Sequence, residues 1–277
     1  MTGLAYPIRL AGFGFRRPKA LNPGRDLAGV VEAVGGAVTG FAVGDEVYGT
    51  AESTFAEYAR TTPDRLAPLP RNLSFTDAAT VPVSGVTALK AVRDQARVRA
   101  GESVLVLGAS GGVGTFAVQL ARQFGAQVTG VCSTAKLDVV RGLGVDRVID
   151  YTQQDPVDGQ ARYDVILDIG RNRRLSHLRR ALTPRGRLVL VGGEDGGNWL
   201  GGMDRSLRAA LLSPFVSQTL TAFIAWESGT DLAALTELVE AGSVAPVVER
   251  AYPLAETGAA IAHLSSGRAR GKLAVTI

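Results

Sequence analysis

The sequence predicts an α/β protein with a doubly wound parallel sheet, accompanied by a smaller β-rich domain. Three observations lead to this fold class. After residue 84, short apolar runs alternate with amphipathic helical segments, a pattern typical of parallel sheets. A glycine-rich turn at 108–114 joins one such run directly to a helical segment. Before residue 84, short strand-like runs follow one another across glycine turns with no helix between them.

The composition is that of an ordinary globular protein. The chain has 277 residues, of which 46% are hydrophobic and 20% charged, enough apolar material for one or two domain cores. The single cysteine, Cys132, excludes a disulfide framework. Arginines interrupt the first 20 residues, so no signal peptide is expected, and the least polar stretch, 209–226, is too polar to span a membrane. We therefore expect a soluble, cytoplasmic protein.

A formal charge of +4 and an isoelectric point near 9.4 raise the question of nucleic-acid binding. The arginine-rich stretch 171–180 surrounds apolar leucines and contains no aromatic residue, so we interpret it as a solvated helix face. No nucleic-acid motif accompanies it. A modest positive field would also suit an anionic cofactor.

The first 83 residues predict the β-rich domain. Residues 1–20 are irregular, and Ser74 is expected to cap a short helix because Asp77 stands at its third position. The segment 82–88 leads into a helix at 89–96. The strand-like runs of this part lie at 26–35, 44–49, 55–60 and 65–68.

The alternating part predicts the parallel sheet. Its strands are expected at about 103–107, 127–132, 146–149, 163–167, 187–191 and 219–225. Its helices are expected near 115–124, 135–143, 173–182, 203–212 and 231–241. A final strand, helix and strand at 245–249, 255–264 and 272–277 are expected to return to the first domain. The predicted domains are therefore 1–83 with 242–277, and 84–241.

The turn after the strand 103–107 predicts a dinucleotide site. It reads Ala109-Ser-Gly-Gly-Val-Gly114, which fits A-x-G-x-x-G between a strand and a helix. Small residues allow a pyrophosphate to approach the backbone N–H groups, and the helix N-terminus favours its negative charge. The alternative is a tight turn with a structural role only.

The residues after the second strand of this sheet favour NADPH over NADH. An NAD site places a carboxylate about 20 residues beyond the glycine turn. Here the sequence offers Ser133, Thr134 and Lys136, and the first carboxylate is Asp138 within the next helix. Hydroxyl groups and a cation suit a 2′-phosphate. The alternative is that Lys136 is an ordinary surface lysine.

Several segments together resemble the zinc-independent medium-chain dehydrogenases/reductases of the quinone oxidoreductase branch. The resemblance covers nearly the whole chain and implies a GroES-like catalytic domain and a Rossmann domain that binds NADPH. The segments that carry it are Gly24-Arg-Asp-Leu-Ala-Gly29, Val43-Gly-Asp-Glu-Val47, Pro82-Val-Ser-Gly-Val-Thr-Ala88, Ala109 to Gly114, Val148-Ile-Asp-Tyr151, Tyr163 to Asp168, Leu188 to Gly193 and Gly271-Lys272.

The resemblance also implies roles for single residues, each of which could instead be structural. Thr87 would lie near the nicotinamide, and Gly192 and Gly193 would let the cofactor pass close to the chain. The pyrophosphate would be held by Ser110, Gly111, Gly112, Val113 and Gly114. The 2′-phosphate would be surrounded by Ser133, Lys136 and Tyr151.

No metal site is expected. Zinc-dependent relatives carry Gly-His-Glu in the region where this chain has Gly24-Arg25-Asp26, and they use cysteine ligands. The only histidines, His177 and His263, stand on predicted helices without ligand-like spacing. They are interpreted as packing or surface residues.

Members of the family begin with several β-strands ahead of the segment that matches residues 1–20. We therefore expect either that the natural start lies upstream of Met1 or that a short form exists whose substrate pocket is incomplete. The first reading is favoured for biological function.

The expected reaction is hydride transfer from NADPH to a quinone or an α,β-unsaturated carbonyl compound. Two alternatives stay open: a non-catalytic NADPH-binding redox sensor, and a metal-free reductase of simple aldehydes or ketones. No catalytic side chain is assigned, since Tyr48 and Tyr58 are better explained as strand residues. The resemblance implies a homodimer, formed by edge pairing near 219–225.

Overall fold

The computed structural model describes residues 23–170, 173–191 and 203–277. The chain divides into two compact units. Among the described residues, the first contains Lys90–Ser110 and Ala117–Ile224. The second contains the described part of Leu21–Leu89 together with Gly111–Phe116 and Ala225–Ile277. The domain limits given by the sequence stay a prediction.

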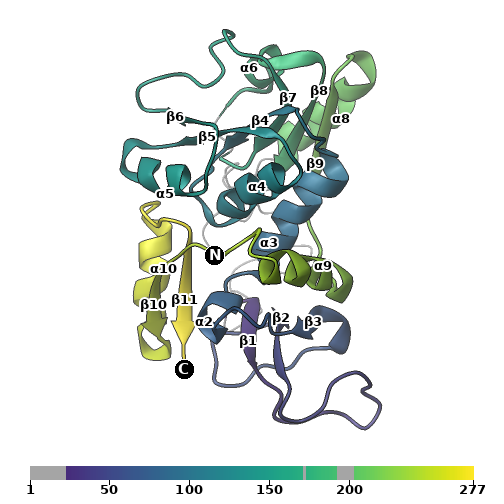
Figure 1. Ribbon diagram of the computed structural model, residues 1–277, viewed down its shortest axis with the longest axis vertical. Coiled ribbons are helices and arrows are strands. Elements are labelled where there is room, and N and C mark those ends of the chain that lie inside the picture. Colours follow the sequence, from purple (N-terminus) through teal and green to yellow (C-terminus); the bar gives the residue numbers. More distant parts are fainter. Residues whose placement is uncertain (1–22, 171–172, 192–202) are drawn as a thin grey trace. The chain divides into compact units, whose positions relative to one another are not determined.

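The first unit is built on a six-stranded, fully parallel sheet with strand order β6-β5-β4-β7-β8-β9 (Figure 1). This order reverses direction between β4 and β7, which confirms the predicted doubly wound topology. Its strands are β4 (Ser103–Leu107), β5 (Gln127–Cys132), β6 (Arg147–Asp150), β7 (Tyr163–Asp168), β8 (Leu182–Val191) and β9 (Thr219–Phe223).

Helices cover this sheet and close its core. Leu105, Ile166 and Leu188 are completely buried at the centre of the core. Helix α5 packs on β5 and β6, and α8 packs on β9. The helices that follow the strands are α4 (Gly112–Gln123), α5 (Leu137–Gly142), α6 (Leu175–Arg180) and α8 (Met203–Leu212).

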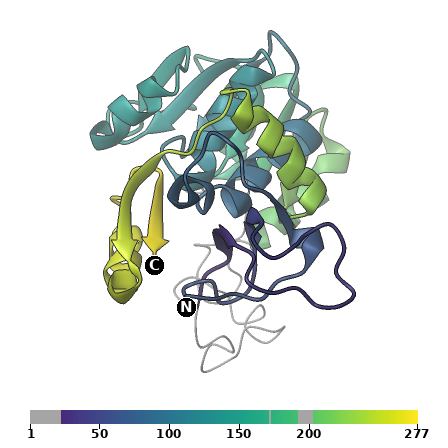
Figure 2. The same cartoon turned by 60° about the horizontal axis from the view of Figure 1, so that its bottom comes forward.

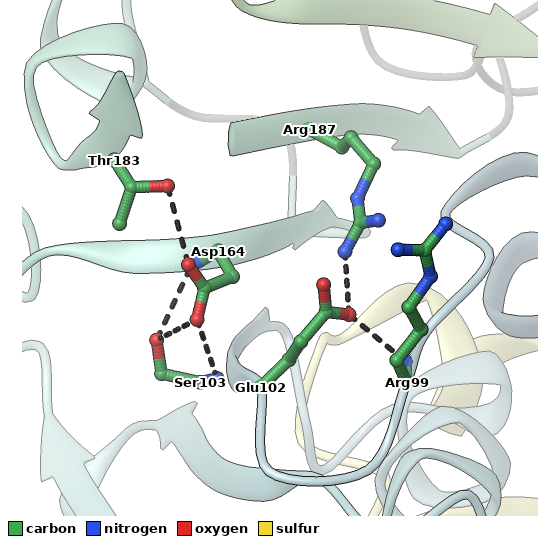
Figure 3. A network of polar contacts seen from close by, with 6 residues as sticks. All are labelled: Arg99, Glu102, Ser103, Asp164, Thr183 and Arg187. Carbon is green, nitrogen blue, oxygen red and sulfur yellow. Dashed lines mark hydrogen bonds and ion pairs between the residues drawn. The ribbon is translucent and has the colours of Figure 1, made fainter. Parts of the chain in front are cut away.

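Polar side chains fasten the amino ends of three strands together (Figure 3). The Asp164 carboxylate accepts hydrogen bonds from Ser103 and from Thr183 Oγ1 at 3.2 Å. Beside it, Glu102 accepts from Arg187 at 2.5 Å and from the Arg99 backbone N–H at 2.9 Å. The groups are partly buried at the amino ends of the strands, and these hydrogen bonds take the place of the water that would otherwise solvate them.

The second unit contains two small sheets. Strands β1 (Asp26–Val30), β2 (Glu46–Thr50) and β3 (Leu66–Pro68) form an antiparallel sheet, whereas β10 (Val248–Pro253) and β11 (Lys272–Thr276) pair in parallel. Helix α10 (Thr257–Ser265) lies against the β10–β11 pair (Figure 2). The remaining helices are α2 (Phe75–Ala78), α3 (Pro82–Leu89) and α9 (Gly229–Glu240).

Several predicted elements differ from the structure. The helix expected at 89–96 already begins at Pro82, whose fixed φ suits a first helical turn, and it continues as a π-helix over Lys90–Gln95. The run 55–60 forms no strand, and the strand expected at 187–191 begins at Leu182. The last two strands, which were expected to return to the first domain, lie in the same unit as β1–β3 and form a sheet of their own. The predicted cap at Ser74 is confirmed, since its Oγ accepts the Asp77 N–H at 3.1 Å.

In the parts of the chain that the structure describes, no helix is both long and apolar enough to cross a bilayer. The expectations for residues 1–20 and for Gly192 and Gly193 lie outside the described residues.

Candidate nucleotide-binding site

The glycine-rich turn begins directly after β4, at a position whose backbone conformation favours glycine. Gly108 has a φ of +82°, and an added Cβ would lie 3.0 Å from the Gly170 backbone nitrogen. The Ala109 N–H donates to the Val131 carbonyl oxygen at 3.0 Å, which ties the turn to β5. Ser110 is buried, and α4 begins at Gly112, three residues earlier than predicted. The predicted residues Gly112, Val113 and Gly114 therefore belong to the first turn of α4, where backbone N–H groups have no partner within the helix.

In the second unit, Gly112 packs against the side chain of Lys272. A Cβ on Gly112 would come within 2.9 Å of Lys272 Cδ and 3.3 Å of Ser84 Oγ. A parallel β-bridge joins Gly111 to Gly271, so the residue before Lys272 is paired with the residue before Gly112. The lysine stem thus lies close against the first turn of α4 because a glycine is present.

Two polar partners fix the ammonium group of Lys272. It donates to Asp26 Oδ2 at 3.2 Å and to Ser84 Oγ at 3.0 Å, and the other oxygen of Asp26 accepts the Val83 N–H at 2.8 Å. Both the Lys272 and the Asp26 side chains are 17% exposed. A helix N-terminus and a fixed cation together suit an anionic group such as a pyrophosphate.

Local sequence patterns did not indicate this cluster. Asp26, Ser84 and Lys272 all stand in segments that carried the family resemblance, but none was given a role there. The cluster depends on the contact between Gly112 and a residue 160 positions away. Strand pairing creates that contact, and the periodicity of the sequence does not reveal it.

In the first unit, the structure brings together the three residues predicted to surround a 2′-phosphate. Strands β5 and β6 end side by side, because Cys132 pairs with Asp150. The Tyr151 N–H donates to the Cys132 carbonyl at 3.1 Å, and the Lys136 N–H donates to the Ser133 carbonyl at 2.9 Å. Tyr151 is 54% exposed, so part of its ring is accessible to a ligand.

A carboxylate that was missed when counting along the sequence lies at the same corner. Asp150 accepts a hydrogen bond from Thr134 Oγ1 at 2.5 Å and another from Thr152 Oγ1 at 2.7 Å. The hydrogen bond from Thr134, followed by those from Thr152, holds the pKa of Asp150 below its ordinary value. The group is therefore an anion at neutral pH, and it opposes a second anion nearby.

Thr87 is half-buried in α3 and follows Ser84 by three residues, so the two stand on neighbouring positions of one helix face. Ser84 is a partner of Lys272. Thr87 therefore belongs to the same small neighbourhood of the second unit as the lysine cluster.

Two side chains with reactive groups serve the fold. Burial raises the pKa of Tyr48 to about 12, and its hydroxyl bonds to the Leu232 carbonyl and to Thr236, each at 2.9 Å. Burial likewise raises the pKa of the Cys132 thiol to about 11, so a thiolate does not form at neutral pH. Tyr58, by contrast, is 72% exposed.

Potential metal ligands are dispersed. Within residues 23–170, 173–191 and 203–277, no three His, Cys, Asp or Glu side chains are grouped so that they could hold a metal ion. His263 Nδ1 lies 2.8 Å from the Tyr252 hydroxyl, and its Nε2 lies 3.7 Å from Glu249.

Comparison with known proteins agrees with this architecture. Residues 6–71 match the family model of the alcohol dehydrogenase GroES-like domain, and residues 143–275 match that of the zinc-binding dehydrogenases. A quinone oxidoreductase from Pongo abelii is 33% identical over 91% of this chain and 78% of its own length. A 2-methylene-furan-3-one reductase from Solanum lycopersicum is 32% identical over 93% of this chain.

The chain spans 64% of the length of that tomato reductase. Among solved structures, a quinone oxidoreductase from Coxiella burnetii superposes with a TM-score of 0.83 at 27% identity, covering 100% of this chain and 88% of its own. These sequence matches and the doubly wound sheet lead to one assignment: the chain belongs to the medium-chain dehydrogenase/reductase family and resembles its quinone oxidoreductases.

Proposed function

We propose that the protein is an NADPH-dependent oxidoreductase that reduces a quinone or an α,β-unsaturated carbonyl compound without zinc. The observation that carries the proposal is the Lys272 ammonium group, held by Asp26 and Ser84 beside Gly112 at the start of α4. This arrangement combines a cation with unpaired backbone N–H groups, as the diphosphate of a dinucleotide requires.

The proposed cofactor residues form three sets. Lys272 is added to the pyrophosphate set because its ammonium group has three N–H donors, of which Asp26 and Ser84 take two. Thr87 is proposed near the nicotinamide, and Gly192 and Gly193 are kept from the family resemblance. The pyrophosphate set is Ser110, Gly111, Gly112, Val113, Gly114 and Lys272; the 2′-phosphate set is Ser133, Lys136 and Tyr151.

NADPH is proposed over NADH because of the charge of the residues in the 2′-phosphate set. Lys136 supplies the cation there, and Ser133 and Tyr151 supply hydroxyl groups. Asp150 acts in the opposite direction, but Thr134 and Thr152 occupy its oxygens. The balance of these two charges sets the preference.

A reduced nicotinamide supplies the hydride when it is bound. The chain's residues hold it and keep its phosphates in place. The acceptor class is supported by the relatives named quinone oxidoreductase and 2-methylene-furan-3-one reductase, since a 2-methylene-furan-3-one is itself an α,β-unsaturated ketone. Such acceptors spread the incoming negative charge over a conjugated system, which lessens the need for a Lewis acid.

The donor set supports the proposal that the protein works without zinc, although the matching family model is described as zinc-binding. The whole chain offers one cysteine and two histidines. Cys132 is buried with a raised pKa, and His263 is engaged by Tyr252 and Glu249. These groups do not fit the three-ligand catalytic or four-ligand structural sites that zinc occupies.

The test is NADPH oxidation followed at 340 nm with 1,4-benzoquinone, an enone and a simple aldehyde, each with and without EDTA. Turnover of the quinone or enone that EDTA leaves unchanged supports the proposal. Calorimetry with NADPH on the same sample gives binding separately. Tight binding without reduction of any acceptor would favour a redox sensor, and reduction of the aldehyde alone would favour the simple-carbonyl reductase.

We also propose a homodimer through the edge of the parallel sheet. Among the described strands, β9 pairs with β8 alone and is an outer strand of the sheet, and an outer strand can pair with a strand of a second chain. Phe215 and Ile224, close to β9 in sequence, are 85% and 69% exposed. Light scattering on an Ile224→Glu variant should then show monomer where the wild type shows dimer.

A further inference from the structure

A buried carboxylate in the second unit has no part in the cofactor sets. The Glu227 side chain is only 4% exposed, and its Oε2 accepts a hydrogen bond from Arg25 Nη2 at 2.7 Å. Burying a charge is costly, and an ion pair of this kind adds little net stability compared with apolar residues. Burial of the Glu227 carboxylate beside an exposed guanidinium group is therefore better explained by a task for Arg25 than by a gain in stability.

The backbone around Arg25 is fixed as firmly as its side chain. Gly24 has a φ of +111°, and an added Cβ would lie 2.5 Å from Thr54 Oγ1. The Arg25 carbonyl accepts the Ala51 N–H at 2.9 Å. The hydrogen bond from Ala51 thus holds the Arg25 backbone just before β1, and Glu227 holds its guanidinium group.

The residue after Arg25 belongs to the candidate cofactor site. Asp26 holds Lys272 beside Gly112, at the start of α4. Arg25 and Asp26 are consecutive, so the guanidinium group is carried by the same short segment that positions the proposed pyrophosphate lysine.

The guanidinium group keeps donors for another ligand. Arginine has five N–H donors, and Glu227 takes one at Nη2. The Arg25 side chain is 46% exposed, whereas its partner is almost completely covered. The pair therefore presents a positive, planar set of donors at the surface with its counter-charge buried behind it.

We propose that Arg25 is a catalytic residue that donates to the carbonyl oxygen of the bound quinone or enone, and that Glu227 is its positioning residue. This inference rests on the proposed function. In the reaction of an enone, a hydride and its electron pair pass from NADPH to the β-carbon. The carbon–carbon π electrons then move to the carbonyl oxygen, giving an enolate and NADP⁺. Water then donates a proton to the α-carbon and leaves as hydroxide, which restores the carbonyl group.

Arg25 assists because the negative charge on that oxygen grows during hydride transfer. A donor that is already fixed stabilises the transition state more than the ground state. A guanidinium group also stays protonated at any working pH, so it stabilises the oxyanion without giving up its own proton.

The experiment compares Arg25→Met, Arg25→Lys and Glu227→Gln with the wild type, using NADPH and an enone. Arg71→Met is the matched control, since Arg71 also pairs with a glutamate in this unit, at 4.0 Å from Glu240. We expect Arg25→Met to lower kcat/KM by about 100-fold. Arg25→Lys should fall between Arg25→Met and the wild type, and the Kd for NADPH should stay within about twofold in all of them, since Arg25 touches the acceptor only.

Chemical rescue separates catalysis from a structural role. Millimolar guanidinium should restore part of the turnover that Arg25→Ala loses and leave the turnover of Arg71→Met unchanged. Since Arg25→Met leaves Glu227 buried without its partner, the double variant Arg25→Met/Glu227→Met serves if the single variant fails to fold. Glu227→Gln should lower kcat more than it changes KM.

Two results would overturn the inference, and they are distinguishable. An active wild type whose Arg25 variants lose melting temperature but keep kcat/KM would show a purely structural pair and leave the proposed function standing. A folded wild type that reduces neither quinone nor enone would remove the proposed function and this inference together.

Discussion

Asp164 and Ser103 hold each other through three hydrogen bonds at the amino ends of β7 and β4 (Figure 3). Asp164 Oδ2 accepts both the N–H and the Oγ–H of Ser103 at 3.0 Å, and Ser103 Oγ lies 3.1 Å from the Asp164 N–H. The bond from the Ser103 backbone N–H, followed by those from the Ser103 and Thr183 hydroxyls and by nearby Arg187, lowers the pKa of Asp164. The pair joins two neighbouring central strands at their amino ends, whereas the glycine turn follows the carboxyl end of β4.

This lowered pKa predicts an acid-sensitive contribution to stability. The folded-state pKa lies below the unfolded value, so the contribution is complete above about pH 4 and is lost as the pH falls through the folded pKa. Asp164→Asn should destabilise the protein by about 1–2 kcal/mol at neutral pH and flatten the pH dependence of unfolding below pH 4. Urea unfolding from pH 3 to 7 measures both. Asp138→Asn, whose side chain is 95% exposed, is the control and should change neither.

The corner formed by Lys136 and Asp150 predicts two opposite changes in cofactor preference. Lys136→Glu should reduce the NADPH-to-NADH ratio of kcat/KM at least about tenfold, because it replaces the proposed phosphate partner with an anion. Asp150→Asn should raise that ratio, because it removes an anion from the same corner. Steady-state kinetics with both cofactors tests the pair. Movement in the same direction, or none, would contradict the assignment of this corner to the 2′-phosphate.

The lysine beside Gly112 predicts a loss of affinity for both cofactors alike. Lys272→Met should weaken binding of NADPH and NADH about tenfold each, because the pyrophosphate is common to them. Lys272→Arg should keep most of the affinity. Gly112→Ala should weaken binding too, since its Cβ would lie 2.9 Å from the lysine stem. Calorimetry gives the constants, and equal affinities in wild type and Lys272→Met would exclude this contact.

Tyr48 predicts a structural effect without a kinetic one. Tyr48→Phe should lower the free energy of unfolding by roughly 1 kcal/mol, because the hydroxyl bonds to the backbone of α9 and to Thr236. Its pKa near 12 keeps the hydroxyl protonated across the working range, so the pH profile of kcat should not move. A shifted profile would make Tyr48 a candidate proton donor.

Local patterns predicted the parallel sheet well because its strands are continuous apolar runs. The strands at 103–107 and 127–132 were predicted residue for residue. The starts of helices were predicted less accurately than the strands. Helix α4 begins inside the glycine motif, because the same residues belong both to the turn and to the first turn of the helix. The start of β8 at Leu182 was missed because Pro184 and Gly186 look like a turn in sequence, although the strand continues through them.

Contacts across the sequence explain what was missed at the site. Ser133, Lys136 and Tyr151 stay a prediction; they were proposed as cofactor residues because a strand end and its following turn are local features. Lys272 and Asp26 were not, because each acquires its meaning from a partner far along the chain. The same holds for Arg25 and Glu227, which are 202 positions apart.

The bridge between Gly111 and Gly271 has a practical consequence for dissecting the molecule. A fragment limited to residues 84–241 would retain the glycine turn while lacking Asp26 and Lys272. Weak nucleotide binding by such a fragment would then reflect the loss of these two residues, which are proposed to form part of the phosphate site. Experiments on recognition of the cofactor accordingly call for the uncut polypeptide, with its final β-strand left in place.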